Sequence, residues 1–202
     1  MLLEHTGKRP AISDSAYVAP TATISGDVRI GANSRVLFGA VLTADGGPIE
    51  IGESCIVMEN AVVRGTGRHP TRIGSSCLVG PRASLSGCTV EDSVFLATGV
   101  TVFNGARIGK GAEVRVNAVV HVNSRVASGA AVPIGWVAVG DPAEVLPPNE
   151  HERIWAIQKG LDFPGTVFGL ARAPADELML RLTERYARGL AAHLHDRILD
   201  SD

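Results

Sequence analysis

A period of six residues runs through most of the chain and strongly limits its fold. From Ile12 the sequence reads ISDSAY, VAPTAT, ISGDVR, IGANSR and VLFGAV. Each block opens with a branched aliphatic residue and carries a small or β-branched residue at its fifth place. An amphipathic helix would repeat every 3.6 residues and a half-buried strand every two. The six-residue period instead predicts a parallel β-helix of short strands and tight corners.

The number of blocks sets the size of this solenoid. The first residue of each block should fill the interior, and the fifth must be small because the interior is narrow. Gly, Asn or Asp at the corners tolerates a left-handed backbone. Three blocks make one triangular coil, so 21 blocks predict about seven coils. The aligned first positions are Ile12, Val18, Ile24, Ile30, Val36, Leu42, Ile51, Val57, Val63, Ile73, Val79, Leu85, Val90, Leu96, Val102, Ile108, Val114, Val120, Val126, Ile134 and Val139.

Interruptions of the period are also informative. The insertions ADGGP after Leu42 and GTGRHPT after Val63 lie on the same face, so both should leave from one corner of successive coils. Loops on a rigid scaffold often carry function. The spacing also changes after Leu85, Val126 and Ile134.

The chain is expected to divide into a β-helix domain, 1–146, and a helical extension, 147–202. Asn149 should cap a first helix, which Gly160 would close. A second helix should begin near Pro174 or Ala175. Its apolar stripe needs a partner, either its own solenoid or a neighbour's. That stripe comprises Leu178, Leu182, Tyr186, Gly189, Leu190, Leu194 and Ile198.

Charge and composition exclude several partners. The net charge of -2 gives no reason to expect a nucleic acid or an anionic membrane as partner. No apolar run approaches the roughly 20 residues of a membrane span, and the start MLLEHTGKRP does not read as a secretory leader. Cys55, Cys77 and Cys88 form no C-x-x-C pair, which favours reduced thiols in a cytoplasmic protein. Cys55 and Cys77 should stack as core thiols rather than act as a redox pair.

Three stretches resemble the γ-class carbonic anhydrases. They are AVLTADGGPIEIGESCIVMENAVVRG from Ala40, LVGPRASLSGCTVEDSVFLATGVTVFNGARIG from Leu78, and the closing VAVGDPAEVL. The resemblance covers roughly Ile12 to Ala156. It implies an all-β solenoid of the left-handed parallel β-helix type with C-terminal α-helices, a homotrimer, and a zinc ion between subunits.

The zinc ligands of that family are replaced in this sequence. The family's "VVH" corresponds to Val62, Val63 and Arg64, and its "IGHNAxLHGC" corresponds to VGPRASLSGC, which contains Pro81 and Ser86. Arg is a permanent cation, Pro has no side-chain donor, and neutral Ser is a poor ligand. No zinc and no CO2 hydration are therefore expected at Arg64, Pro81 and Ser86.

A crevice between subunits remains the expected site. By the family's motifs, Asp45, Glu59, Arg64 and Ser86 would line it. An ion pair across the interface, from Arg64 to Glu59 or Asp45, could stand in for the metal. The alternative is that Arg64 points into solvent.

The second inserted loop is basic. It carries Arg64, Arg68 and Arg72 with His69 and no acidic residue. Such a loop either stays in water or holds a small anion, such as a phosphate, a carboxylate or the diphosphate of coenzyme A.

A metal site elsewhere is not expected, because only His69 and His121 fall within or beside the coils. His5, His151, His193 and His195 lie outside the repeat. His193 and His195 should be exposed near a helix end, where they suit the helix dipole.

Three functions stay open. The favoured one is a trimeric γ-carbonic-anhydrase-like protein that has lost its zinc and acts as a scaffold or binds a small anion. The alternative is an acyltransferase or thioesterase that uses coenzyme A, with His121 as the available base. A zinc hydratase with unforeseen ligands is the third. The fold alone does not decide between them.

Overall fold

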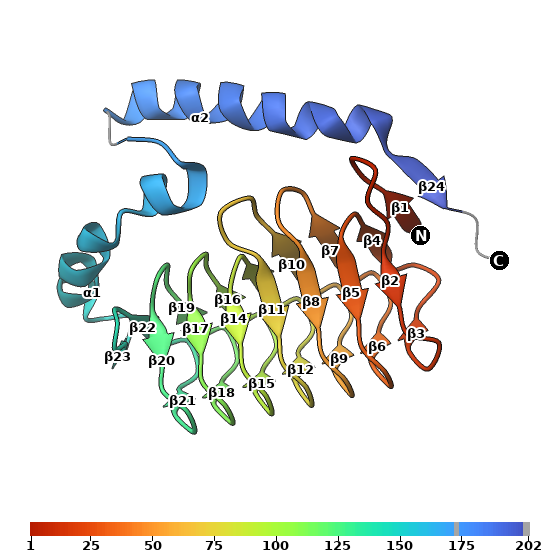
Figure 1. Cartoon of the computed structure of the whole chain (residues 1–202). Helices are drawn as coiled ribbons and strands as arrows, with labels where there is room; N and C mark the ends of the chain where they lie inside the picture. The colour runs from red at the N-terminus through yellow and green to blue at the C-terminus, as the bar shows by residue number, and fades with distance from the viewer. Residues whose placement is uncertain (172–173, 200–202) are drawn as a thin grey trace.

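The protein forms a triangular solenoid with a helical strap along one corner (Figure 1). The structure is a computed structural model and describes residues 1–171 and 174–199. Three parallel sheets form the sides, and each coil adds one short strand to each side. This confirms the predicted left-handed parallel β-helix of about seven coils followed by helices.

From Ala11 onward, each coil passes through sheets I, II and III in turn. Sheet I contains β2 (Ala11–Ile12), β5 (Val28–Ile30), β8 (Ile49–Ile51), β11 (Thr71–Ile73), β14 (Thr89–Val90), β17 (Arg107–Ile108) and β20 (Arg125–Val126). Sheet II contains β3 (Tyr17–Val18), β6 (Arg35–Val36), β9 (Ile56–Val57), β12 (Leu78–Val79), β15 (Phe95–Leu96), β18 (Glu113–Val114) and β21 (Ala131–Val132).

Sheet III is longer than the others. It contains β24 (Arg197–Leu199), β1 (Leu2–Glu4), β4 (Thr23–Ser25), β7 (Val41–Ala44), β10 (Val62–Gly65), β13 (Ser84–Ser86), β16 (Thr101–Val102), β19 (Val119–Val120), β22 (Val137–Val139) and β23 (Glu144–Leu146). Only its two end pairings are antiparallel: β24 pairs with β1, and β22 pairs with β23.

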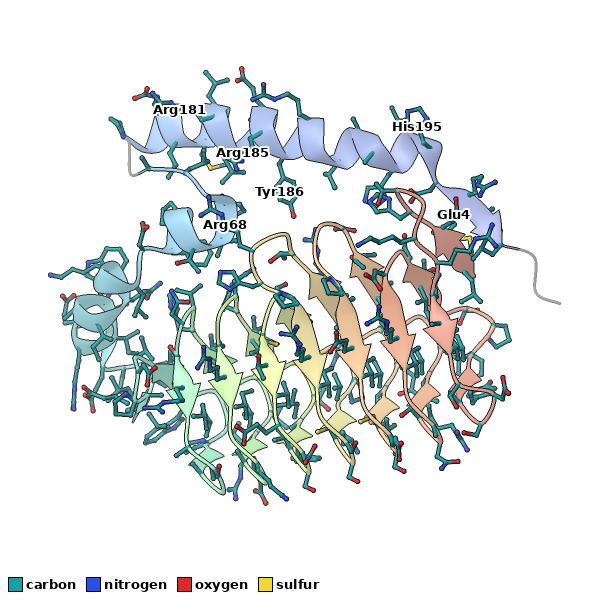
Figure 2. All side chains as sticks on the ribbon, viewed as in Figure 1. Glu4, Arg68, Arg181, Arg185, Tyr186 and His195 are labelled. Carbon is teal, nitrogen blue, oxygen red and sulfur yellow. The ribbon has the colours of Figure 1, made fainter. Side chains whose placement is uncertain are left out.

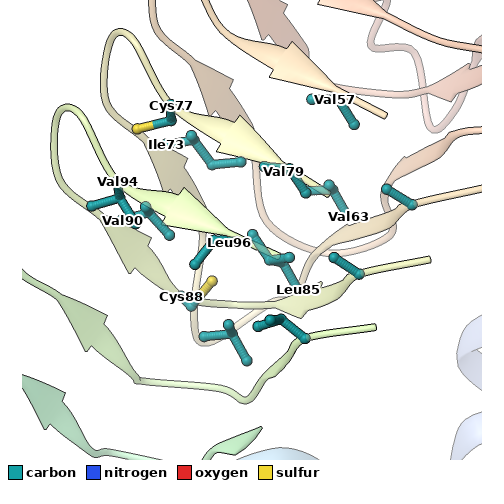
Figure 3. Packing of buried hydrophobic residues seen from close by; sticks show 14 of the residues in the cluster. Val57, Val63, Ile73, Cys77, Val79, Leu85, Cys88, Val90, Val94 and Leu96 are labelled. Carbon is teal, nitrogen blue, oxygen red and sulfur yellow. The ribbon is translucent and has the colours of Figure 1, made fainter. Parts of the chain in front are cut away.

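The six-residue block explains this geometry. First-place residues stack in register, as Val63 does between Leu42 and Leu85, and all three are fully buried. The fourth place turns the corner with a positive φ, for example 59° at Asn33 and 71° at Gly39. Gly and Asn adopt this left-handed conformation at low cost. The aliphatic interior that results is continuous from coil to coil (Figure 3).

The three cysteines lie in this interior as free, buried thiols. The Cys55 Sγ donates to the Gly74 carbonyl at 2.9 Å, and the Cys77 Sγ donates to that of Glu91 at 3.1 Å. Burial raises the pKa of Cys88 to about 12. The cysteines therefore pack as small core residues, in agreement with the sequence-based interpretation.

The register at the end of the solenoid differs from the prediction. Val132, not Ile134, is the inward residue of β21: it pairs with Val114 and is fully buried, whereas Ile134 is 66% exposed. In the next block Ala138 pairs with Val120. The spacing therefore stays at six from Val126 to Ala138. The prediction was wrong because Val132 and Ile134 are both aliphatic and only the register distinguishes them.

The two insertions leave from the corner between sheets III and I, as predicted, where β7 leads into β8 and β10 into β11 (Figure 1). Their backbones stack closely. A Cβ on Gly65 would lie 2.0 Å from the carbonyl oxygen of Gly47, so glycine is required there. A third loop at this corner, between β1 and β2, is closed by the bridge between His5 and Lys8.

The tail crosses the end of the solenoid and returns along the same corner. It comprises α1 (His151–Gln158), a 3-10 turn (Lys159–Leu161), a π-helical turn (Pro164–Phe168), α2 (Ala175–Leu190), a second 3-10 turn (Ala191–His195) and β24. Figure 1 shows α2 above the corner loops and β24 beside β1. Among the described residues, no helix combines the length and the apolarity needed to cross a bilayer.

Several details of the tail differ from expectation. Glu150, not Asn149, occupies the N-cap of α1 and makes no side-chain cap, and the chain continues in the 3-10 turn past Gly160. The second helix begins at Ala175 as predicted but ends at Leu190. Leu194 and Ile198 fall in the following turn and strand and are mostly exposed, so they do not extend its apolar stripe.

Candidate functional site

A cavity of about 260 Å³ lies between α2 and the corner loops. Its floor comes from the solenoid: Asp45, Gly46, Arg64, Gly65, Thr66, Gly67, Ser86 and Asn104. Its roof comes from the tail: Val167, Phe168, Leu170, Leu182, Arg185, Tyr186, Gly189, Leu190 and His193. Figure 2 shows Tyr186 and Arg185 directed from α2 toward the solenoid. The cavity therefore joins a polar floor to a largely apolar roof.

Arg64 is the central charge on the floor. The register of sheet III places it beside Thr43 and Ser86 at the end of β10. Its Nη2 donates to the Asp45 Oδ2 at 2.9 Å, and its guanidinium carbon lies 5.9 Å from the centre of the Tyr186 ring. This is within the range of a cation–π contact. The Arg64 side chain is 33% exposed, so it is held beneath the strap rather than free in solvent.

Within one chain, Arg64 forms an ion pair with Asp45, one of the two partners that the sequence suggested. Glu59 takes no part in it. Glu59 and Pro81 lie in turns at the corner between sheets II and III, whereas the cavity lies at the corner between sheets III and I. Of the three residues expected at the family's metal positions, Arg64 and Ser86 line the cavity and Pro81 does not.

The arginines of the basic loop do not converge within one chain. Arg68 reaches the π-helical turn and donates to the Gly165 carbonyl at 3.3 Å. Arg72 lies on the outer face of sheet I and pairs with Glu50 at 3.3 Å. Arg185, which the sequence gave no reason to select, joins Arg64 at the cavity instead, because α2 folds back over the corner.

His121 is buried at 5% exposure, outside the cavity. Its ring lies 5.8 Å from that of Phe103 and 6.0 Å from that of Phe163. Burial lowers its pKa, so the imidazole is neutral at pH 7. Phe163 comes from the tail, and within one chain it covers the base that an acyltransferase mechanism would need.

The sequence did not predict a cluster of two histidines and an aspartate, which lies next to the cavity and beside the N-terminal strand β1. The Asp196 carboxylate joins two histidines, with Oδ1 at 2.6 Å from the His5 Nδ1 and Oδ2 at 2.8 Å from the His193 Nδ1. The two imidazole rings stack with centroids 4.4 Å apart. His193 was expected to be exposed, but the turn after α2 brings it against His5. A separation of 191 residues between His5 and Asp196 gives no local signal for this contact.

Asp45 connects this cluster to Arg64. While its Oδ2 accepts from Arg64, its Oδ1 lies 3.5 Å from the His193 Nε2. This Oδ1 atom is buried without a hydrogen-bond partner among the described residues. Burial acts to raise the pKa of Asp196, but the hydrogen bonds with His193 and His5 offset it and hold that pKa below its usual range. Asp196 is therefore ionised at neutral pH.

Comparison with known proteins identifies relatives by sequence. The chain is 35% identical over 153 residues to γ carbonic anhydrase 1, a mitochondrial protein of Arabidopsis thaliana; the match covers 73% of this chain and 54% of that protein. It is 30% identical over 110 residues to a carbonic anhydrase of Geobacillus kaustophilus, covering 54% and 60%. The chain spans about half the length of the Arabidopsis relatives. No protein-family model matches it.

Among solved structures, the UDP-N-acetylglucosamine acyltransferase of Francisella novicida is similar with a TM-score of 0.58 and 18% identity. The match covers 91% of this chain and 84% of that one. At this identity the likeness shows the fold alone. The sequence matches and the coils of six-residue blocks show that the chain belongs to the γ-carbonic-anhydrase-like family of hexapeptide-repeat proteins.

Proposed function

We propose that this protein binds a small organic anion in the cavity beneath α2 and does not hydrate CO2 at its relatives' zinc position. The observation that carries this proposal is the placement of Arg64. Two of the three positions at which the family's zinc ligands are expected, Arg64 and Ser86, line the cavity. An arginine there supplies a fixed positive charge where the metal would supply its own.

The charge of the cavity supports an anionic ligand. Arg64 and Arg185 line it, and Asp45 is the carboxylate of its lining. Arg185 donates to a neutral acceptor, the Gly169 carbonyl, at 3.3 Å. The acidic and basic side chains of the lining therefore leave one excess cation. Guanidinium groups bind carboxylates and phosphates through paired N–H donors.

The size and lining of the cavity narrow the class of ligand. At about 260 Å³ it lies below the range of roughly 300–1,000 Å³ that is typical for drug-sized ligands. Phe168, Leu182, Tyr186 and Leu190 form an apolar roof. A carboxylate with a short apolar group fits this combination better than coenzyme A does. Phe163 also covers His121, which disfavours the acyltransferase alternative.

Replacing Arg64 by glutamine tests the proposal. Calorimetry with acetate, propionate, benzoate and inorganic phosphate should find a ligand of the wild-type protein. Its Kd should rise at least about tenfold in Arg64→Gln, because a hydrogen bond to a charged group contributes roughly 1.5–3 kcal/mol. Arg72→Gln is the matched control from the same loop and should bind within about twofold of wild type.

Two results would contradict anion binding in this cavity. One is a wild-type protein that binds none of the four anions at millimolar concentration. The other is an Arg64→Gln variant, folded by circular dichroism, that binds as tightly as wild type. Arg185→Gln serves as a second variant, and it should weaken binding in the same direction.

We also propose a homotrimer that assembles through sheet II and its corner with sheet III. The resemblance to the γ-class enzymes implies a trimer. The outer face of sheet II supports it, because Tyr17, Ile56 and Phe95 are 42%, 38% and 44% exposed. Exposed apolar side chains that share one face of a sheet are typical of protein interfaces. Glu59 and Pro81 lie at the corner between sheets II and III, where they would face a neighbouring subunit.

Light scattering tests the assembly. Three chains of 21.1 kDa should give about 63 kDa for the wild-type protein. Phe95→Asp should give the mass of one chain, because it places a charge among the exposed apolar side chains of sheet II. Arg107→Asp, on sheet I, should leave the trimer intact. A monomeric wild-type protein, or a trimeric Phe95→Asp variant, would exclude this interface.

The three free thiols fit a reducing compartment, and we therefore propose that the protein is cytoplasmic.

A further inference from the structure

We propose that His5, His193 and Asp196 form a binding site for a divalent transition-metal ion, and that zinc is the ion it fits best. The proposal does not depend on anion binding in the cavity. Within residues 1–171 and 174–199, the ligand atoms of these three side chains lie within 4.8 Å of one another. Two imidazoles and a carboxylate are a ligand set that zinc accepts, with a fourth position left open.

The distances describe a site in its metal-free form. The two Nδ1 atoms lie 2.6 and 2.8 Å from separate oxygens of Asp196. Ligands of a tetrahedral zinc ion, each about 2.0–2.1 Å from the metal, are roughly 3.3 Å apart. Each nitrogen–oxygen pair would therefore separate by roughly 0.5–0.7 Å when an ion enters.

The backbone fixes the ligands from both ends of the chain. The β24 strand pairs antiparallel with β1, with Glu4 opposite Arg197, so the residues next to Asp196 and His5 are joined in one sheet. Paired backbone hydrogen bonds of 3.0 Å between His5 and Lys8 close the loop that carries His5. The site is therefore assembled before any metal binds, which reduces the entropic cost of binding.

Asp45 completes the arrangement around His193. If His193 binds the metal through Nδ1, its Nε2–H is free to donate to the Asp45 Oδ1, which lies 3.5 Å away and is buried without another partner. A carboxylate that accepts from the second ring nitrogen is the usual support for a zinc-bound histidine. This explains why a buried carboxylate oxygen is directed at a histidine that already contacts Asp196.

The packing of the cluster also favours a bound ion. His5 is 3% exposed, and its ring is stacked on that of His193. An ion bound to both Nδ1 atoms would also contact the carboxylate that lies between them. Because His193 also lines the cavity, an open coordination position would lie near Arg64.

The site differs from the zinc site of the relatives. That site would use the positions of Arg64, Pro81 and Ser86 in the coils, whereas the proposed one joins the loop after β1 to the tail after α2 within a single chain. Mutations can therefore distinguish zinc binding at the proposed site from zinc binding at the relatives' position.

Zinc titration of the full-length, metal-stripped protein, with a competing chromophoric chelator, tests the site. One equivalent per chain should bind with sub-micromolar Kd, and Co2+ should give the visible absorption of a tetrahedral complex. His193→Ala and the nearly isosteric Asp196→Asn should each weaken zinc binding by about a hundredfold or more. His195→Ala, at an exposed neighbouring residue, and Ser86→Ala, at the relatives' position, should bind as wild type does.

Thermal unfolding gives a second readout. Zinc should raise the Tm of the wild-type protein and of His195→Ala, but not that of Asp196→Asn. Substoichiometric or only millimolar zinc binding by the wild-type protein would overturn the proposal. So would full binding by a folded Asp196→Asn variant. Binding that is lost in Ser86→Ala and kept in Asp196→Asn would place the metal at the relatives' position instead.

Discussion

Replacing Gly65 by alanine should destabilise the corner that carries the cavity more than any other single-methyl change in the two insertions. The new Cβ would lie 2.0 Å from the Gly47 carbonyl oxygen and 2.9 Å from that of Pro48. Both contacts are with backbone, so no side chain can move aside. Overpacking of this kind costs typically about 1–3 kcal/mol. Because Gly65 lines the cavity, anion binding should weaken at the same time.

The same loop offers a matched control. A Cβ on Gly67 would meet only the Gly46 carbonyl oxygen, at 3.7 Å, which is ordinary van der Waals contact. Gly67→Ala should therefore change the free energy of unfolding by less than about 0.5 kcal/mol. Urea unfolding followed by circular dichroism compares the two variants. Equal stabilities would show that the stacking of the two loops is not as close as described.

Truncating Leu85 to alanine should have the largest effect on the solenoid itself. Leu85 is fully buried in sheet III between Val63 and Val102, directly beside Ser86 on the cavity floor. Removing a buried leucine side chain costs about 2–5 kcal/mol, through lost burial and the cavity that remains. The urea midpoint should fall accordingly, with the far-UV spectrum of the folded state unchanged.

Ser84→Ala is the control for that substitution. Ser84 precedes Leu85 on the same strand, but successive side chains of a strand point to opposite faces, and Ser84 is only partly buried. Its replacement should change stability by less than about 0.5 kcal/mol. If Ser84→Ala destabilised the protein as much as Leu85→Ala does, the assignment of Leu85 to the interior face of sheet III would be wrong.

The repeat was predictable because it is local and redundant. Each block carries its own inward residue, small residue and corner residue, so one ambiguous block does not alter the fold. Errors arose where the chain offers two equivalent choices, as with Val132 and Ile134, or where a helix end depends on packing, as with Asn149 and Gly160. Register and helix caps are settled by neighbouring elements rather than by the segment itself.

The candidate site was predictable only in part. Arg64 and Ser86 were selected because they belong to motifs of fixed spacing, and both line the cavity. Their true companions, Arg185, Tyr186 and His193, could not be found in this way. They lie in a tail whose route over the solenoid leaves no periodic signal in the sequence.

By itself, the sequence determined the solenoid, its built-up corner and the presence of Arg64 where relatives are expected to bind zinc. These features follow from a six-residue period that each coil repeats with its immediate neighbours. The tertiary structure decided what the corner encloses. The return of α2 and β24 to β1 places Tyr186 over Arg64 and joins His5 to Asp196. Such contacts depend on where the apolar face of the tail packs, and no local pattern encodes that choice.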